Sequence, residues 1–195
     1  EVVNGLVDAD TGRPRANDLV LGNANAGSGS DLARTFGLDR PVHHLADHFV
    51  SDTVTPLDLG VVHFRDRHGE PRSRVFANVA QIGFGGQVVA TSSRLPRRMG
   101  RSRYGLAIVV AWGLFRRQPT RVVFDGGEVT ESLCNVVVAN GQFFGGGMQV
   151  APRALPDDGL FSLQAWGGSV GDLVRAGRQL RDGDHLARPD VREWR

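Results

Sequence analysis

Residues 133–166 read LCNVVVANGQFFGGGMQVAPRALPDDGLFSLQAW, and the rest of the chain is organised around this stretch. It contains a short β-branched run, Val136 to Val138, which the turn signal Asn140-Gly141 ends. Such a run is typical of a strand covered on both faces. Three glycines follow, residues 145–147, where a side chain would obstruct a close backbone approach or forbid a positive φ. An acidic turn then leads into an alternating strand that ends at Trp166.

The acidic turn, residues 155–160, places Asp157 and Asp158 directly before Gly159. Asp and Gly are good turn formers, and the carboxylates cap their own backbone. The same turn also offers a carboxylate and main-chain carbonyls, the oxygen ligands that Mg²⁺ or Ca²⁺ requires. From the spacing alone a plain turn is the favoured interpretation, and a hard-cation site is the alternative.

The composition is that of an ordinary globular protein, and 195 residues can bury a sizeable core. The net charge of +2 indicates no strong field for nucleic acid. The single cysteine, Cys134, cannot form an internal disulfide and is expected to be a small buried hydrophobe, which suits a reducing compartment. The longest apolar run, residues 106–115, is about half a membrane span, and no signal-peptide pattern opens the chain. A cytoplasmic protein is therefore expected.

Hydrophobic periodicity and turn signals predict a mixture of helices and strands. The helix over residues 104–117 is apolar nearly all round, so we expect it to be buried on most sides. Residues 125–128 predict a hairpin turn, and the charged tail from residue 181 is expected to be weakly structured. The other expected helices are residues 1–7, 31–36, 85–93 and 170–180, and the expected strands are residues 19–21, 57–64, 72–82, 121–124, 129–139 and 160–166.

A glycine- and serine-rich loop leads into the helix expected at Asp31. Ser30 is a suitable N-cap, Asp31 complements the positive helix end, and Gly37 supplies a stop. Backbone N–H groups and the dipole at a helix start favour phosphate, so the loop is a candidate anion site. A capped loop without a ligand is the alternative.

Two further segments have both a plain and a functional interpretation. His44 and His48 are spaced to share a helix face and to bind a metal, but no third ligand stands at a suitable distance, which favours a solvated connector. The loop from Arg94 to Arg103 carries five arginines around Leu95 and Met99. It is either solvated or a patch for anionic lipid headgroups.

Four motifs, in order along the chain, resemble the bacterial diacylglycerol and lipid kinase family, which is related to the sphingosine kinases. They are EVVNGL at residues 1–6, GSGSDLAR at 27–34, NVAQIGFG at 78–85, and the run from VVANG to DDGL within residues 137–160. The resemblance implies an α+β fold. Residues 1–40 would be the end of an α/β nucleotide-binding domain, and residues 41–195 an antiparallel β-sandwich-like domain with inserted helices, incomplete at its C-terminus.

The resemblance also implies an activity, which is transfer of the γ-phosphoryl group of ATP to the hydroxyl of diacylglycerol or a related lipid. It implies a nucleotide site at Gly27, Ser28, Gly29 and Asp31. It further implies a structural Mg²⁺ held by the Asp158 carboxylate and by the carbonyls of Leu155 and Leu160. The implied partners are nucleotide and a lipid substrate at an anionic membrane surface, with peripheral membrane association and no nucleic acid. The resemblance allows a homodimer.

Two parts of the family's mechanism have no counterpart in the chain. The Gly-Gly-Asp-Gly-Thr phosphate loop would precede Glu1, and the acidic segment with the general base would follow Arg195. We therefore assign no catalytic residue and expect an incomplete copy of the enzyme. The alternatives are a non-catalytic membrane-binding module derived from a lipid kinase and a relative of NAD kinase. The sequences flanking this chain would discriminate between an enzyme and a binding module.

Overall fold

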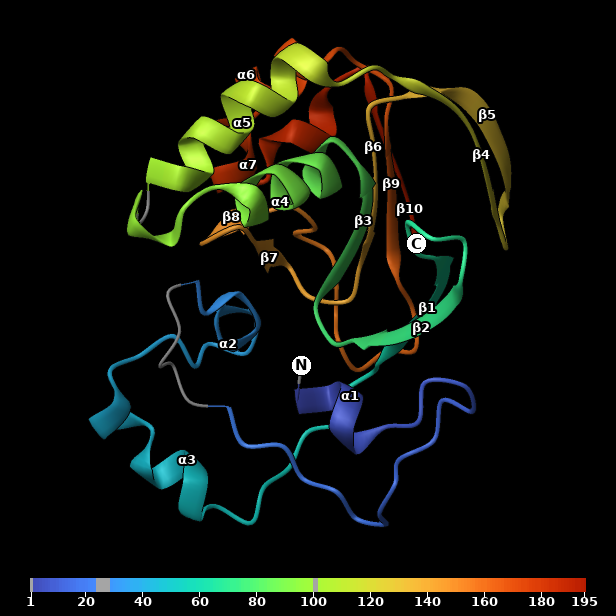
Figure 1. Ribbon diagram of the computed structural model, residues 1–195. Helices are drawn as coiled ribbons and strands as arrows, with labels where there is room; N and C mark the ends of the chain where they lie inside the picture. Colours follow the sequence, from blue (N-terminus) through green and yellow to red (C-terminus); the bar gives the residue numbers. More distant parts are fainter. Residues whose placement is uncertain (1, 24–28, 100–101) are drawn as a thin grey trace. The chain divides into compact units, whose positions relative to one another are not determined.

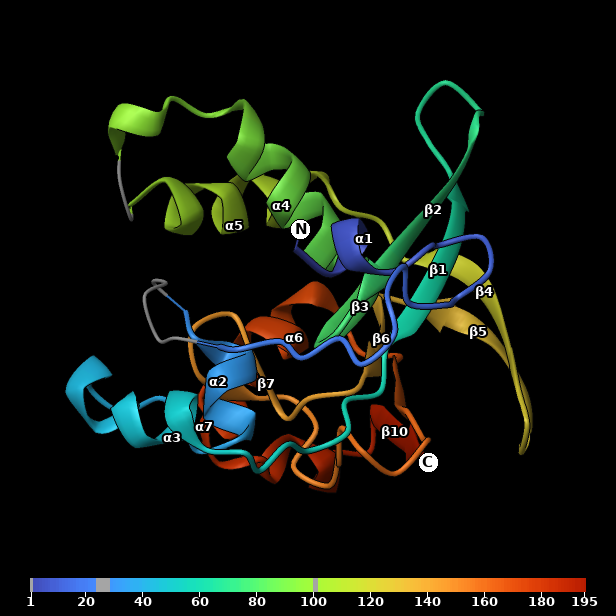
Figure 2. The same cartoon turned by 90° about the horizontal axis from the view of Figure 1, so that it is seen from below.

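A computed structural model describes residues 2–23, 29–99 and 102–195 (Figures 1 and 2). The chain forms two compact units. The first unit comprises Glu1–Ala80 and Ala139–Phe161, and the second comprises Gln81–Val138 and Ser162–Arg195. Helices and antiparallel sheets occur together, which confirms the expected α+β class. The expected domain boundary after residue 40 stays a prediction.

The first unit consists of short elements joined by loops. A β-hairpin is its longest regular part, and the side chain of Asn4 joins the N-terminal helix to this hairpin. Asn4 Nδ2 donates to the carbonyl of Val75 and Asn4 Oδ1 accepts from its N–H, each at 2.8 Å. The elements are α1 (Val2–Leu6), α2 (Asp31–Thr35), the 3₁₀ turn η1 (Val42–His44), α3 (Ala46–Val50), the paired strands β1 (Gly60–Arg65) and β2 (Pro71–Phe76), and the paired strands β7 (Phe143–Phe144) and β8 (Met148–Gln149).

The second unit contains a four-stranded sheet in the order β10-β9-β6-β3, a separate β4-β5 hairpin, and a pair of neighbouring helices, α4 and α5 (Figure 1). Its strands are β3 (Val79–Gly83, which enters from the first unit), β4 (Gln118–Phe124), β5 (Gly127–Leu133), β6 (Asn135–Ala139), β9 (Ser162–Trp166) and β10 (Val191–Trp194). Its helices are α4 (Phe84–Arg94), η2 (Arg97–Met99), α5 (Ser102–Leu114), α6 (Val170–Arg175), α7 (Gln179–Asp182) and η3 (Asp184–Ala187).

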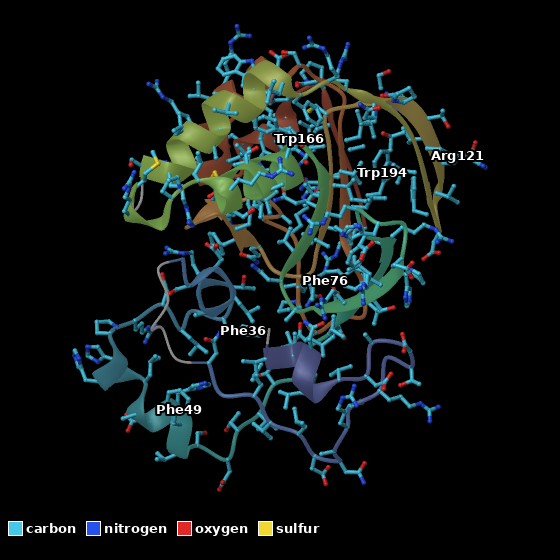
Figure 3. All side chains as sticks on the ribbon, in the orientation of Figure 1. Phe36, Phe49, Phe76, Arg121, Trp166 and Trp194 are labelled. Carbon is cyan, nitrogen blue, oxygen red and sulfur yellow. The ribbon has the colours of Figure 1, made fainter. Side chains whose placement is uncertain are left out.

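Strand β6 of the four-stranded sheet is buried, as the sequence predicts. Val136 and Val137 of β6 are buried, as expected for a run that suits a strand covered on both faces. Trp166, labelled in Figure 3, ends β9 and stacks on the buried ring of His185 with centroids 5.3 Å apart. Aromatic stacking and burial of this size contribute strongly to a small core.

The turn between β3 and α4 depends on one glycine. Gly83 has φ of 112°, a conformation that residues with a side chain rarely adopt. A Cβ there would also overlap the carbonyl oxygen of Cys134. This close approach lets the N–H of Phe84 donate to the Cys134 carbonyl at 2.9 Å, so the start of α4 is fixed to the strand region.

Several local signals are confirmed. Ser169 and Asp172 form a capping box, in which the Asp172 N–H donates to Ser169 Oγ at 3.1 Å and the Ser169 N–H donates to Asp172 Oδ2 at 3.0 Å. Gly37 ends α2 with φ of 67°. Residues 125–126 form the hairpin turn, since Phe124 pairs with Gly127.

Other expectations are wrong. Residues 19–21 form no strand, and three of the longer segments are divided: residues 72–82 into β2 and β3, residues 129–139 into β5 and β6, and residues 170–180 into α6 and α7. The tail is not weakly structured, because β10 pairs with β9 from Val191↔Trp166 to Trp194↔Leu163. The helix over 104–117 is not buried on most sides. One face, with Ala107, Ile108 and Ala111, packs against the core, and four large aliphatic side chains of α5 remain exposed.

Candidate functional site

The glycine-rich segment between β7 and β8 is bonded to the start of α2, within the first unit. The carboxylate of Asp31 accepts from the N–H of Gly146 at 3.1 and 3.0 Å and from the N–H of Gly147 at 2.7 Å. Gly145, Gly146 and Gly147 have φ of 62°, 88° and 104°, as the sequence predicts for glycines at these positions. Successive N–H groups in such a conformation converge on an anion, and here that anion is the Asp31 carboxylate.

A second set of contacts joins the other end of α2 to the segment that follows β6. Thr35 Oγ accepts from the N–H of Gln142 at 3.1 Å and donates to the Asp31 carbonyl at 3.4 Å. A Cβ at Gly141 would overlap the side chain of Asn78 and press against Thr35 Oγ. The Asn140-Gly141 turn signal therefore has a second role, because glycine allows α2 and Asn78 to approach the backbone.

Two side-chain amides, that of the buried Asn140 and that of the half-buried Asn78, hold the base of this site. Asn140 Nδ2 donates to the carbonyls of Asp58 at 2.7 Å and of Ala77 at 2.9 Å, and Asn78 Nδ2 donates to the Phe143 carbonyl at 2.9 Å. Their Oδ1 atoms are buried and have no hydrogen-bond partner among the described residues. Buried polar atoms in proteins are almost always paired. The base of the site thus presents oxygen acceptors that a water or a ligand donor can satisfy.

Arg34 supplies the positive charge beside the glycine segment. Its guanidinium lies 5.7 Å from the centroid of the Phe143 ring, and its Nη1 is 3.2 Å from Asp39 Oδ2. A Cβ at Gly147 would come within 3.4 Å of the guanidinium carbon. Arginine binds phosphate groups through a planar fork of N–H donors, so this position suits an anionic ligand.

The acidic turn also belongs to the first unit, and its backbone is held by two carboxylates. Asp58 Oδ2 accepts from the N–H of Gly159 at 2.6 Å, and Asp158 Oδ1 accepts from the N–H of Leu160 at 3.0 Å. The N–H of Asp58 donates to the Pro156 carbonyl at 2.7 Å. Sequence reasoning missed Asp58, because the contact spans 101 residues and no local signal marks it.

The residues expected to bind nucleotide are only partly placed. Gly29 and Asp31 are described, whereas Gly27 and Ser28 lie outside the described residues. Ser30 occupies the N-cap position of α2, as expected, but it has φ of 54° and its side chain makes no capping hydrogen bond. Ser30 in this left-handed conformation precedes Asp31, whose carboxylate bonds to the glycines. The nucleotide site stays a prediction.

In the part of the chain that the structure describes, no group of three or more His, Cys, Asp or Glu side chains is arranged to hold a metal ion. His44 and His48 are exposed, in agreement with the favoured interpretation of a solvated connector. Cys134 is buried, as expected, and burial raises its pKa from 9.0 to about 11. Its thiol is therefore protonated at neutral pH and unsuited to nucleophilic chemistry.

The fold is shared with solved structures of bacterial lipid-kinase type. A diacylglycerol kinase from Bacillus anthracis strain Sterne aligns with a TM-score of 0.53 and 17% identity, over 86% of this chain and 50% of that chain. Another crystal structure from the same organism aligns with a TM-score of 0.58 and 18% identity, over 86% of this chain and 53% of that one. At this identity the likeness defines the class of fold.

Sequence comparison defines the family. The model of the YegS C-terminal NAD kinase beta sandwich-like domain matches residues 78–195. This chain belongs to that family. It is 32% identical over 177 residues to a protein named diacylglycerol kinase from Mycobacterium tuberculosis, covering 89% of this chain and 56% of the relative.

A second curated relative comes from Chromohalobacter salexigens and is named a probable YegS-like lipid kinase. It is 32% identical over 166 residues, covering 84% of this chain and 49% of the relative. The chain therefore spans about half the length of the curated relatives it matches. The names of these relatives agree with the lipid-kinase resemblance of the motifs.

Proposed function

We propose that this chain is part of a lipid kinase that transfers the γ-phosphoryl group of ATP to the hydroxyl of diacylglycerol or a related lipid. Membership of the YegS family and the names of the curated relatives support this function. Such transfer depends mainly on positioning the phosphates and neutralising their charge. The chain would contribute the end of the nucleotide site and the β-sandwich-like domain.

The contact between Asp31 and the glycine segment is the observation that most supports this proposal. It joins the motif at residues 27–34 to the motif within residues 137–160, which lie more than 100 residues apart. These two motifs of the resemblance thus meet at one place, and Asn78, the first residue of a third motif, bonds to the Phe143 carbonyl beside it. Asp31 would act as a positioning residue that joins the start of α2, at the end of the first of these motifs, to the glycine segment, and Arg34 lies close to Gly147. The nucleotide phosphates would lie along this segment.

The acidic turn fits a structural Mg²⁺. Leu155 and Leu160 are 48% and 51% exposed, so water can reach their surroundings. Mg²⁺ binds oxygen ligands in octahedral geometry and keeps several waters. One carboxylate from Asp158, two carbonyls from Leu155 and Leu160, and about three waters complete such a shell. The ion would stabilise the turn, and no step of phosphoryl transfer is assigned to it.

The proposed partners follow from the reaction. The lipid substrate lies in a membrane, so the enzyme would be cytoplasmic and associate peripherally with an anionic membrane surface. Among the described residues no helix has the length and apolar character needed to cross a bilayer. A homodimer remains part of the proposal, to be tested by measuring the molar mass in solution.

The experiment is a kinase assay on the full-length protein that carries this chain, with labelled ATP and diacylglycerol in mixed micelles. Ser28→Ala should raise the KM for ATP by about tenfold and leave the KM for lipid unchanged, because one hydrogen bond to a charged group contributes about 1.5–3 kcal/mol. Ser51→Ala, in an exposed connector, is the matched control. Absence of lipid phosphorylation would refute the kinase proposal, and equal KM values would remove Ser28 from the site.

A further inference from the structure

Helix α5 has two apolar faces, and only one of them is packed. Ala107 and Ala111 are fully buried against α4 and α6, in a core with Phe84, Val88 and Val170. The opposite face carries four large aliphatic side chains that remain in solvent. These are Leu106, Val109, Val110 and Leu114, which are 40%, 65%, 37% and 67% exposed.

These four residues form one continuous stripe. Val109, Val110 and Leu114 follow Leu106 by three, four and eight residues, which places all four along a single helix face. Trp112 lies beside the stripe and is 48% exposed. A surface helix normally presents polar side chains to water, so a contiguous exposed stripe of this kind marks an interaction surface. We refer to Leu106, Val109, Val110 and Leu114 as the outward face of α5.

The charges around the outward face have one sign. Between Pro71 and Phe124 the sequence contains ten arginines and no aspartate or glutamate. Of these, Arg98 is exposed before α5 begins, and Arg116 and Arg117 are exposed just after it ends. Both ends of the apolar stripe are therefore positively charged. This arrangement complements a surface that is apolar inside and negatively charged at its border.

We propose that the outward face of α5 docks on an anionic lipid bilayer, with the helix axis in the plane of the surface and the flanking arginines among the headgroups. An exposed apolar helix face can insert at the boundary between headgroups and acyl chains, and each arginine near an anionic surface adds to the affinity. The choice of a bilayer as the partner rests on the proposed lipid kinase function. The binding itself does not require phosphoryl transfer.

A second copy of this chain is the competing occupant, and the charges disfavour it. If two outward faces met, the arginines at their ends would face arginines, because this part of the sequence has no acidic residue to pair with them. Asp172, at the start of α6, lies 3.1 Å from an arginine nitrogen of Arg175 and 3.8 Å from one of Arg188. It is already paired with cations of its own region.

Vesicle sedimentation tests the proposal directly with the 195-residue chain. Vesicles of phosphatidylglycerol and phosphatidylcholine should bind the chain, and vesicles of phosphatidylcholine alone should bind it much less. The double substitution Val109→Glu and Leu114→Glu should reduce the partition coefficient by about tenfold or more, because two charged side chains on the outward face oppose its transfer from water into the bilayer. Val123→Glu is the matched control, since Val123 is 66% exposed on the β4-β5 hairpin. It should bind like the original chain.

A second measurement separates docking from misfolding. Arg98→Gln with Arg116→Gln should weaken binding several-fold at low salt and little at high salt, because salt screens surface charge. Arg74→Gln, an exposed arginine of the first unit, should have no effect. Trp112 emission should shift to shorter wavelength on binding, and Trp112→Phe should remove this shift. Melting temperatures of all variants verify that they are folded.

Three results would overturn the docking proposal: no binding to anionic vesicles, equal binding by the Val109/Leu114 variant and the Val123 variant, or a concentration-dependent dimer that the Val109/Leu114 substitutions abolish. The last result would assign the face to a second copy. Vesicle binding without kinase activity in the full-length protein would retain the docking surface and refute the proposed function. The two proposals therefore fail separately.

Discussion

Replacing Asp31 by alanine tests the contact on which the candidate site depends. The substitution removes the acceptor for the N–H groups of Gly146 and Gly147, which lie as close as 3.0 and 2.7 Å to the carboxylate. A hydrogen bond to a charged group contributes about 1.5–3 kcal/mol where water is excluded. Gly146 is exposed and Gly147 is half-buried, so water replaces much of the first bond and less of the second. We expect a total loss of about 2 kcal/mol.

The loss should be local and measurable in two ways. Urea denaturation at pH 7 should show the fall in the free energy of unfolding, and amide hydrogen exchange should accelerate by about thirtyfold at the Gly146 and Gly147 N–H groups. Asp31→Asn keeps one carbonyl acceptor and should lose about half as much. Asp10→Ala, in an exposed loop, is the control and should change stability by less than about 0.5 kcal/mol. Equal stability and equal exchange in the Asp31 and Asp10 variants would refute the reasoning.

The remaining predictions concern three other positions. Gly83→Ala should lower the melting temperature strongly, because φ of 112° is strained for alanine and the new Cβ would overlap a carbonyl oxygen. Gly86→Ala, at a position in α4 with open space around it, should be neutral or stabilising. Equal melting curves for the two variants would contradict this prediction. Asp158→Asn should abolish a Mg²⁺-dependent rise in melting temperature that Asp157→Asn retains, and identical responses would leave a plain turn. Stability should fall as pH rises from 9.0 towards 11, because burial raises the pKa of Cys134 to about 11 in the folded state, whereas the thiol of the unfolded chain ionises near 9.0. Cys134→Ala should lack this part of the decline in stability.

The site illustrates how one residue can have a local and a long-range role. Asp31 lies in the first turn of α2, where it was expected to complement the positive helix end, and its carboxylate also accepts from glycines more than 100 residues away. Ser30, next to Asp31, has a left-handed backbone conformation. Such a conformation usually costs free energy, so tertiary contacts must maintain it. Such contacts are what bring separate motifs of a family together into one site.

Features that depend on neighbouring residues were predictable from the sequence alone. The capping box at Ser169 depends on hydrogen bonds within a few residues, and the stop at Gly37 and the positive φ of the three glycines depend on the absence of a side chain. The buried strand at Val136 follows from a β-branched run that a turn signal ends. The motifs also identified the family, because several short segments in a fixed order are specific even where each one alone is weak.

Features that depend on distant residues were decided only by the tertiary structure. Periodicity shows that α5 is apolar, but not which of its faces another element covers, and the packing leaves the outward face exposed. The charged tail becomes strand β10 because β9 offers an unpaired edge, and residues 19–21 form no strand although they are apolar. Asp58 reaches the acidic turn across 101 residues. A strand edge, a covered face and a long-range carboxylate contact each require a partner whose position the local sequence does not encode.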